Sequence, residues 1–175
     1  PSDFKVTHAE EEKEESSQCP FCEGHEKQTP PEIYAVRQPC AEKDKPGWNV
    51  RVVPSIAPKF NIHGSLDRRG VGMYDIMNPI GAHEVIIESP RHFTDISQLP
   101  AEEIEHVMHA SAERLIDLEK DPRFKYGLLF KNHGLKAGGS KSSKHVRSQI
   151  IVTPVTPTRV KEELKGSLLY YRYKE

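Results

Sequence analysis

The segment Tyr126–Pro154, which reads YGLLFKNHGLKAGGSKSSKHVRSQIIVTP, joins two apolar runs through a loop rich in glycine, serine and lysine. Residues 124–130 are mostly aromatic or aliphatic, and residues 145–152 alternate between polar and apolar side chains, so both runs are predicted to be β-strands. The loop at 136–144 offers small residues, hydroxyl groups and lysines, a composition that suits an anion such as phosphate. A flexible, solvated connection is the alternative interpretation of this loop.

Alternation in the second predicted strand separates its side chains onto two faces. One face carries His145, Arg147, Gln149 and Ile151, and the other carries Val146, Ser148, Ile150 and Val152. The end of this strand nearest the loop is therefore polar on one face, and chemistry is expected there. The loop is not a Walker loop, because Ser140 stands where a lysine should follow Gly139.

The chain has 175 residues, a mass of 19.9 kDa and a formal charge of -1. This length predicts one domain with a substantial core. The near-neutral charge disfavours nucleic-acid binding, for which only the loop lysines argue, and a small ligand is the expected partner. The sequence contains no apolar run long enough to cross a membrane and no apolar leader. Neither a membrane span nor secretion is therefore expected, and the cytoplasm is the predicted location.

The amino-terminal part of the sequence divides at Cys19. Residues 1–18 are acidic and nearly devoid of apolar groups, so a mobile lead-in is predicted before a single domain at 19–175. Cys19 and Cys22 form a C-x-x-C pair that can present two thiolates to zinc, provided that two more ligands come from elsewhere. A redox pair and two ordinary cysteines are the alternatives.

Patterns elsewhere predict three further strands and one helix. The strands are expected at 48–53, 83–88 and 168–173, the helix at 101–120, and a long polar loop at 57–79. The helix has apolar residues three and four apart, acids in its first turn, and a proline beyond its end. Its core face is expected to consist of Ile104, Val107, Met108, Ser111, Leu115 and Leu118.

Several motifs together resemble the amino-terminal half of the galactose-1-phosphate uridylyltransferase family, within the histidine triad superfamily. The motifs are CPFC, GWNVRVVP, GAHEVIIESPRHF, FKNHGLKAGGS and SQIIVTP, and they cover nearly the whole chain. The resemblance implies an α+β fold, in which a histidine-triad-like antiparallel half-barrel sheet packs against one main helix. It also implies zinc, a homodimer, and a second, similar half in the full-length protein.

The family's reaction, by resemblance, has two steps: a histidine takes the uridylyl group from UDP-glucose and passes it to a hexose 1-phosphate. Three of the family's zinc ligands match Cys19, Cys22 and His92. Substrate contacts are implied at Phe21, Ser55, Asn132, Ser140 and Gln149. Ser55 departs from the family, which commonly has an asparagine at that nucleotide contact.

The larger departure is at the family's His-x-His-x-Gln signature, in which the histidines bind zinc and attack phosphorus in that order and the glutamine contacts the phosphate. The residues here are His145-Val-Arg147-Ser-Gln149. If the strand sets the register, His145 is the fourth zinc ligand, Gln149 keeps its role, and Arg147 occupies the nucleophile position. If the loop sets it, His145 is the nucleophile, and the zinc and glutamine positions become Ser143 and Arg147. The first register is favoured, because an insertion in a loop costs less than a slip within a paired strand.

Arginine cannot replace the nucleophile, since its guanidinium stays protonated, although it binds phosphate well. The sequence therefore predicts a relative of nucleotidyltransferases that binds a nucleotide sugar or hexose 1-phosphate. Its activity of the galactose-metabolism type is expected to be impaired or lost. An active nucleotidyltransferase, or an ADP-sugar or dinucleotide phosphorylase, that uses His145 is one alternative. A zinc-stabilised nucleotide-binding module without catalysis is the other.

Overall fold

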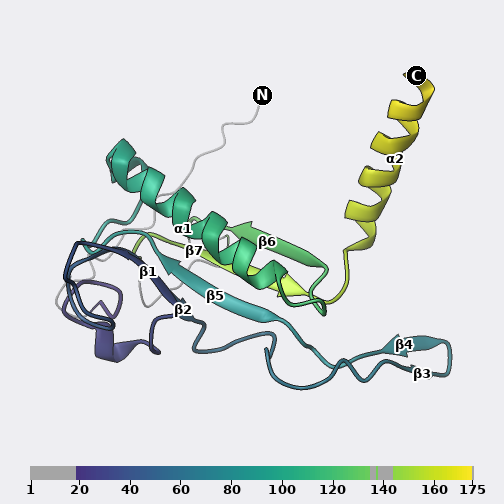
Figure 1. Ribbon diagram of the computed structural model, residues 1–175, viewed down its shortest axis with the longest axis horizontal. Coiled ribbons are helices and arrows are strands. Elements are labelled where there is room, and N and C mark those ends of the chain that lie inside the picture. Colours follow the sequence, from purple (N-terminus) through teal and green to yellow (C-terminus); the bar gives the residue numbers. More distant parts are fainter. Residues whose placement is uncertain (1–18, 135–136, 138–143, 175) are drawn as a thin grey trace, which may run out of the picture.

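The computed structural model of the chain describes residues 19–134, 137 and 144–174. The acidic segment 1–18 lies outside the described residues, as does Ser140 of the expected phosphate loop. Within the described residues the fold is α+β, as predicted, with an antiparallel five-stranded sheet, a separate two-stranded hairpin and two α-helices (Figure 1).

The five-stranded sheet has the order β1-β2-β5-β7-β6, and every neighbouring pair is antiparallel. Its strands are β1 (Tyr34–Arg37), β2 (Trp48–Pro54), β5 (Ala82–Ile87), β6 (Tyr126–Phe130) and β7 (Arg147–Thr153). Four of them confirm predicted strands, with ends that differ by at most two residues. β1 was not predicted, because its short run lies between Pro31 and Pro39 and leaves too little pattern to detect.

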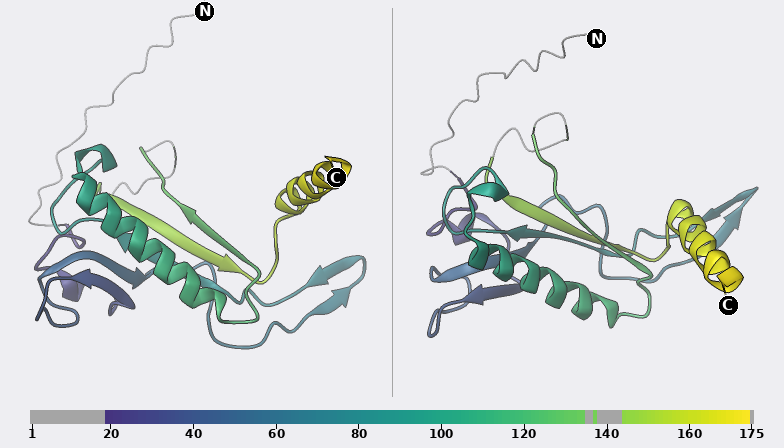
Figure 2. Two further views of the ribbon diagram at one scale, coloured as in Figure 1. Left: turned by 45° about the horizontal axis from the view of Figure 1, so that its top comes forward. Right: turned by 90° about the horizontal axis from the view of Figure 1, so that it is seen from above.

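Helix α1 (Ala101–Glu119) lies along one face of this sheet, as Figures 1 and 2 show, and is the predicted main packed helix. The core between them is made of buried aliphatic residues from both layers: Val50, Val52, Ile86, Val107, Ala110, Leu118, Ile150 and Val152. The prediction that Met108 belongs to the core face is wrong, since its side chain is 52% exposed. One residue beyond buried Val107, its side chain is turned by about 100° around the helix axis.

The alternation predicted for β7 is confirmed by its burial. Ser148, Ile150 and Val152 are buried, whereas Arg147, Gln149 and Ile151 are only half-buried. The half-buried face lies on the side of the sheet away from α1, and Ile87, which pairs directly with Arg147, packs there with Trp48 and Val53. Arg147 and Gln149 of β7 therefore share a face that α1 leaves uncovered.

The contact between α1 and the sheet includes a buried ion pair that no apolar pattern reveals. Arg114 of α1 donates from Nε and Nη2 to the two carboxylate oxygens of Glu84 on β5, at 2.9 and 2.8 Å. Arg114 Nη1 also donates to Asp117 at 2.7 Å. The side chains of Arg114 and Glu84 are 8% and 4% exposed, so the two buried charges neutralise each other.

Glu84→Ala is expected to lower the free energy of unfolding by about 3 kcal/mol, because it leaves the buried guanidinium of Arg114 with only the half-exposed Asp117 as an anionic partner. Glu113→Ala, at an exposed position of α1, is the matched control and should change stability by less than about 0.5 kcal/mol. Urea denaturation of both variants measures the difference. Equal losses would show that the pair does not stabilise the packing of α1.

The carboxy-terminal segment is a helix rather than the predicted strand at 168–173. Helix α2 (Thr158–Lys174) contains those residues, and Arg159 pairs with Glu163 one turn along it at 3.2 Å. The apolar and aromatic run there was misassigned because the helix-forming residues before it were not counted with it. α2 stands clear of the sheet in both views of Figure 2. In the described part of the chain, no helix combines the length and apolar composition needed to cross a membrane.

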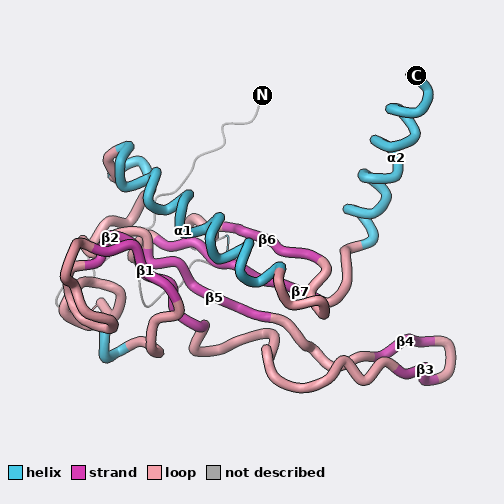
Figure 3. The backbone as a smooth tube through the Cα atoms, viewed as in Figure 1, coloured by secondary structure: helices cyan, strands magenta, loops and turns pink. Residues whose placement is uncertain are grey.

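The long loop predicted at 57–79 contains a hairpin, β3 (Arg69–Val71) paired with β4 (Tyr74–Ile76). Gly72 at the turn has φ +62°, a conformation that favours glycine and permits the tight reversal. The hairpin extends away from the main sheet in Figure 3, and its strand residues are exposed. The described elements also include the short 3-10 helices η2 (Glu26–Gln28) and η3 (Ile96–Gln98).

Candidate functional site

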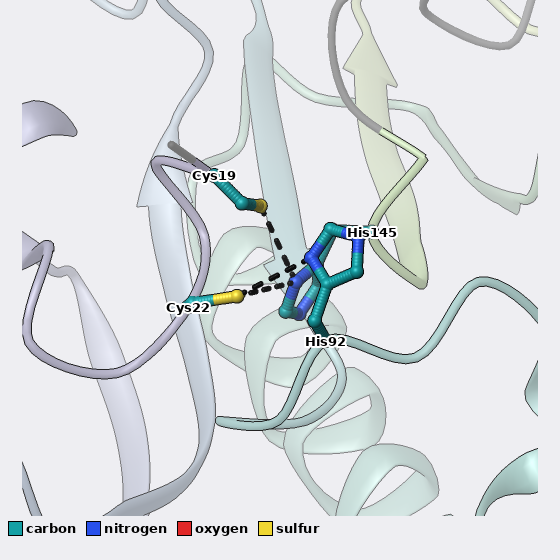
Figure 4. Close-up of side chains that lie close together, drawn as sticks. All are labelled: Cys19, Cys22, His92 and His145. Carbon is teal, nitrogen blue, oxygen red and sulfur yellow. Dashed lines mark hydrogen bonds between the residues drawn. The ribbon is translucent and has the colours of Figure 1, made fainter. Parts of the chain in front are cut away.

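Four side chains, each with one metal-binding atom, converge at the end of the sheet where β5 ends and β7 begins (Figure 4). Cys19 and Cys22 lie on the turn before η2, His92 lies in the loop after β5, and His145 lies two residues before β7 begins. Their ligand atoms all lie within 4.8 Å of one another. Cys22 Sγ is 3.3 Å from His92 Nδ1, and His145 Nδ1 is 3.6 Å from both sulfur atoms. We call these residues the metal group.

The donor set of the metal group fits a tetrahedral ion. Zinc–sulfur bonds of about 2.3 Å and zinc–nitrogen bonds of about 2.0 Å imply sulfur-to-nitrogen edges of roughly 3.5 Å in a regular tetrahedron. The observed sulfur-to-nitrogen distances of 3.3 and 3.6 Å are close to that value. Cys19, Cys22 and His145 are 0%, 8% and 2% exposed, so a bound cation would compensate thiolates that are otherwise buried charges. The group could therefore hold a metal ion.

His145 is oriented with Nδ1 toward the cysteines and Nε2 toward the backbone. Its Nε2 lies 2.8 Å from the carbonyl oxygen of Ser89, which can only accept, so Nε2 carries the proton and Nδ1 the lone pair. Burial lowers the pKa of His145 to about 4; the Ser89 carbonyl opposes this shift, and His92 and Arg147 add to it. The imidazole is therefore neutral near pH 7, which is the form that binds a metal.

The turn that presents the cysteines is shaped by its own backbone. The amide of Cys22 donates to the carbonyl of Cys19 at 3.3 Å, and the amide of His25 donates to the carbonyl of Cys22 at 3.2 Å. The ring of His25 also bonds the Cys19 carbonyl, at 2.6 Å from Nδ1. The amide of Glu23 donates to Pro90 at 3.0 Å and ties this turn to the loop after β5. The first three bonds fix the shape of the turn, and the bond to Pro90 brings it beside a segment distant in sequence.

Arg147 is the first residue of β7 and lies beside the cysteine turn. Its guanidinium carbon is 5.2 Å from the ring centroid of Phe21, and its Nη1 donates to the carbonyl of His145 at 3.2 Å. The Phe21 ring also meets the ring of His145 edge-on, with centroids 6.0 Å apart. Position 147 thus holds a permanent cation that can bind an oxyanion through two N–H groups. It offers no lone pair for attack on phosphorus.

The other residues predicted to contact the substrate lie on several elements of the sheet and its loops. Gln149 is half-buried on the same face of β7 as Arg147, and its Oε1 lies 2.8 Å from Nε2 of His83. The amide of Ser55, directly after β2, donates to the carbonyl of His83 at 2.9 Å. Asn132 follows β6 and is exposed. Ser140 lies outside the described residues, as does Ser143 of the alternative register.

A buried carboxylate that bonds Ser148, the residue after Arg147, was missed by reasoning from the sequence. Glu88 is fully buried; Lys131 Nζ lies 2.6 Å from its Oε2, and Ser148 Oγ donates to its Oε1. Lys131 Nζ also donates to the backbone carbonyl of Arg147 at 3.0 Å. Lys131 thereby ties the end of β6 to the start of β7. In the sequence, the cluster was indicated only by Glu88, the acidic residue that ends the apolar run HEVIIE.

Comparisons with known proteins show that this chain is similar to one part of longer proteins. Residues 72–153 match a family model described as "Domain of unknown function (DUF4931) N-terminal domain". ADP-glucose phosphorylase of Arabidopsis thaliana is 30% identical over 173 residues, which are 98% of this chain and 47% of the relative. Galactose-1-phosphate uridylyltransferase of Thermotoga maritima is 28% identical over 94 residues, which are 54% of this chain and 29% of the relative.

A solved structure agrees with these sequence relationships. The crystal structure of the Arabidopsis thaliana ADP-glucose phosphorylase with bound ADP-glucose matches with a TM-score of 0.72 and 27% identity. The match covers 93% of this chain and 48% of that one. This chain thus spans about half the length of that relative, and the likeness in sequence and fold extends over nearly all of its own residues.

Proposed function

Since this chain belongs to the galactose-1-phosphate uridylyltransferase-like family and corresponds to the amino-terminal half of its relatives, we propose that it binds a nucleotide sugar. It would form the nucleotide-binding part of a protein of the nucleotidyl- or phosphoryl-transferring type. Arg147 and Gln149 would hold the phosphates, and no covalent intermediate would form at position 147. The observation that carries this proposal is Arg147 beside the metal group, on the same strand face as Gln149.

The geometry of His145 supports the register in which it is a metal ligand. Its Nδ1 faces both cysteine sulfurs, and its Nε2 faces the carbonyl of Ser89. Neither ring nitrogen is therefore directed toward a substrate. The alternative, in which His145 is the nucleophile, needs one of these nitrogens at the α-phosphate and away from the cysteines. We accordingly assign the nucleophile position to Arg147.

We propose zinc as the ion held by the metal group. A site with four protein ligands is closed, as in structural zinc sites, and leaves no position for water or substrate. Bound zinc would supply a cross-link between the cysteine turn, the loop after β5 and the start of β7. That cross-link would fix the strand end that carries Arg147, while the residues of the metal group take no part in chemistry.

The guanidinium of Arg147 suits the phosphates of a nucleotide sugar. It is planar, always charged, and presents paired N–H donors that match two phosphate oxygens. The contact with Phe21 holds it beside the cysteine turn. The relative that aligns with 98% of this chain is an ADP-glucose phosphorylase, so ADP-glucose is the first ligand to test and UDP-glucose the second. The hexose contacts are expected from a second half-domain or from the partner in a homodimer.

The closed metal group also favours a second candidate, a zinc-stabilised module that binds no nucleotide. The four ligands lie together independently of any substrate contact, and three of them are nearly inaccessible. If this second function holds, chelation would unfold the protein while added ADP-glucose and UDP-glucose leave its melting temperature unchanged. A rise of the melting temperature with either nucleotide sugar would rule it out.

Arg147→Ala is expected to weaken binding of ADP-glucose by about 10- to 100-fold, the scale of losing charge-assisted hydrogen bonds to phosphate. Arg147→Lys should recover only part of the affinity, since an ammonium group cannot make the paired contact. Calorimetric titration of the zinc-loaded protein measures each affinity. Arg159→Ala, whose side chain is 89% exposed on α2, is the matched control and should bind like the wild type. Lack of wild-type affinity for both ADP-glucose and UDP-glucose would refute the proposed function.

A further inference from the structure

His83 shares a sheet face with the two residues proposed to hold the phosphates. In the register of β5 against β7, His83 lies opposite Ile151, Val85 opposite Gln149, and Ile87 opposite Arg147. Directly paired residues of neighbouring strands point to the same face, so the His83 side chain lies on the face of Gln149 and Arg147. It is half-buried there, as Gln149 is.

The hydrogen bonds of His83 have a fixed direction. The backbone amide of Lys59 lies 3.4 Å from His83 Nδ1, and an amide N–H can only donate. Nδ1 is therefore the acceptor, and the proton of the neutral ring is on Nε2. Nε2 lies 2.8 Å from Gln149 Oε1, so the histidine donates to the carbonyl end of the glutamine side chain.

This arrangement determines which end of the Gln149 amide is available for a ligand. With Oε1 engaged by His83, the two N–H donors of Nε2 occupy the opposite side of the amide group. Phosphate oxygens that are ionised only accept hydrogen bonds, and a glutamine carbonyl turned toward them would repel them. An amide without a partner could rotate and present either end.

We propose that His83 is a positioning residue, which holds the carbonyl of Gln149 so that the amide donates to a phosphate of the bound nucleotide sugar. This inference rests on the proposed function and adds to it a residue that acts only through Gln149. His83 is not a substitute nucleophile, because its one lone pair accepts from Lys59 and its other nitrogen donates to Gln149.

A double-mutant cycle on zinc-loaded protein tests the proposal with ADP-glucose as the probe. His83→Ala and Gln149→Ala should each weaken binding by about five- to tenfold, and the double variant should be no weaker than Gln149→Ala alone. His83→Phe keeps the ring volume without a donor and should bind as weakly as His83→Ala. His83→Gln can donate from its own amide and should restore affinity to within about twofold of the wild type.

The outcomes separate this inference from the proposed function. Additive losses in the double variant, or wild-type affinity in His83→Phe, would overturn the role of His83 while nucleotide binding stands. A wild-type protein with no affinity for ADP-glucose or UDP-glucose would overturn the proposed function and this inference together. Nitrogen-15 NMR of the ligand-free protein should find the His83 proton on Nε2, and a proton on Nδ1 would contradict the hydrogen-bond direction on which the inference depends.

Discussion

Chelation of the zinc that we propose for the metal group is expected to lower the melting temperature by roughly 10 to 20 °C, the result of losing on the order of 5 kcal/mol. The ligands come from three segments, and the cross-link between them is lost with the ion. Buried thiols and a buried imidazole are then left without the cation that compensates them. Differential scanning calorimetry before and after chelation measures the shift, and added zinc should reverse it.

Cysteine variants provide the matched comparison for zinc removal. Cys22→Ser removes a ligand and should reproduce most of the destabilisation without any chelator. Cys40→Ser changes an exposed cysteine outside the metal group and should melt like the wild type, with the same sensitivity to chelation. If Cys22→Ser and Cys40→Ser melted alike, the metal group would not contribute to stability.

Arg147→His is expected to convert a binding site into one that forms a covalent nucleotidyl intermediate. A neutral imidazole has the lone pair that a guanidinium lacks, so the ring nitrogen can attack the α-phosphorus of ADP-glucose. The new nitrogen–phosphorus bond replaces the bond to the bridging oxygen, and glucose 1-phosphate leaves with that oxygen's electron pair. Denaturing mass spectrometry should detect an adenylyl adduct, increased by orders of magnitude over wild-type protein.

Arg147→Gln is the control for this gain of chemistry, because it also removes the guanidinium but has no nucleophilic nitrogen. It should form no adduct at any concentration of ADP-glucose. Peptide mapping should place the adduct of Arg147→His at position 147. An adduct at His145 would instead assign the nucleophile to His145 and contradict its place in the metal group.

Four strands of the main sheet and α1 could be predicted because their signals are local. β7 alternates, β2 and β5 are short apolar runs closed by proline or serine, and α1 repeats at three and four residues. The strand predicted at 168–173 failed because leucine and aromatic residues suit both a strand and a helix. The helix-forming residues that begin at Thr158 continue through this run, so it is part of a helix and not a strand.

The metal group was reached from the sequence because the family resemblance had already assigned Cys19, Cys22 and His92. No motif in the sequence indicated the side-chain contacts between strands that are far apart in the chain. His83 and Gln149 are 66 positions apart, and the Glu88–Lys131 pair joins the ends of β5 and β6, which are not neighbours in the sheet. Their meeting depends on the register of β5 and β7, which alternation alone does not specify.

The central claim, that His145 is a zinc ligand and Arg147 a phosphate-binding residue without nucleophilic capacity, is tested most directly by the intact mass of the protein. Spectra should be recorded under native-like and denaturing conditions, before and after incubation with ADP-glucose and UDP-glucose. The account predicts one zinc-sized increment that disappears on denaturation, non-covalent nucleotide sugar under native-like conditions, and no covalent adduct. A nucleotidyl adduct on His145 that survives denaturation would contradict it.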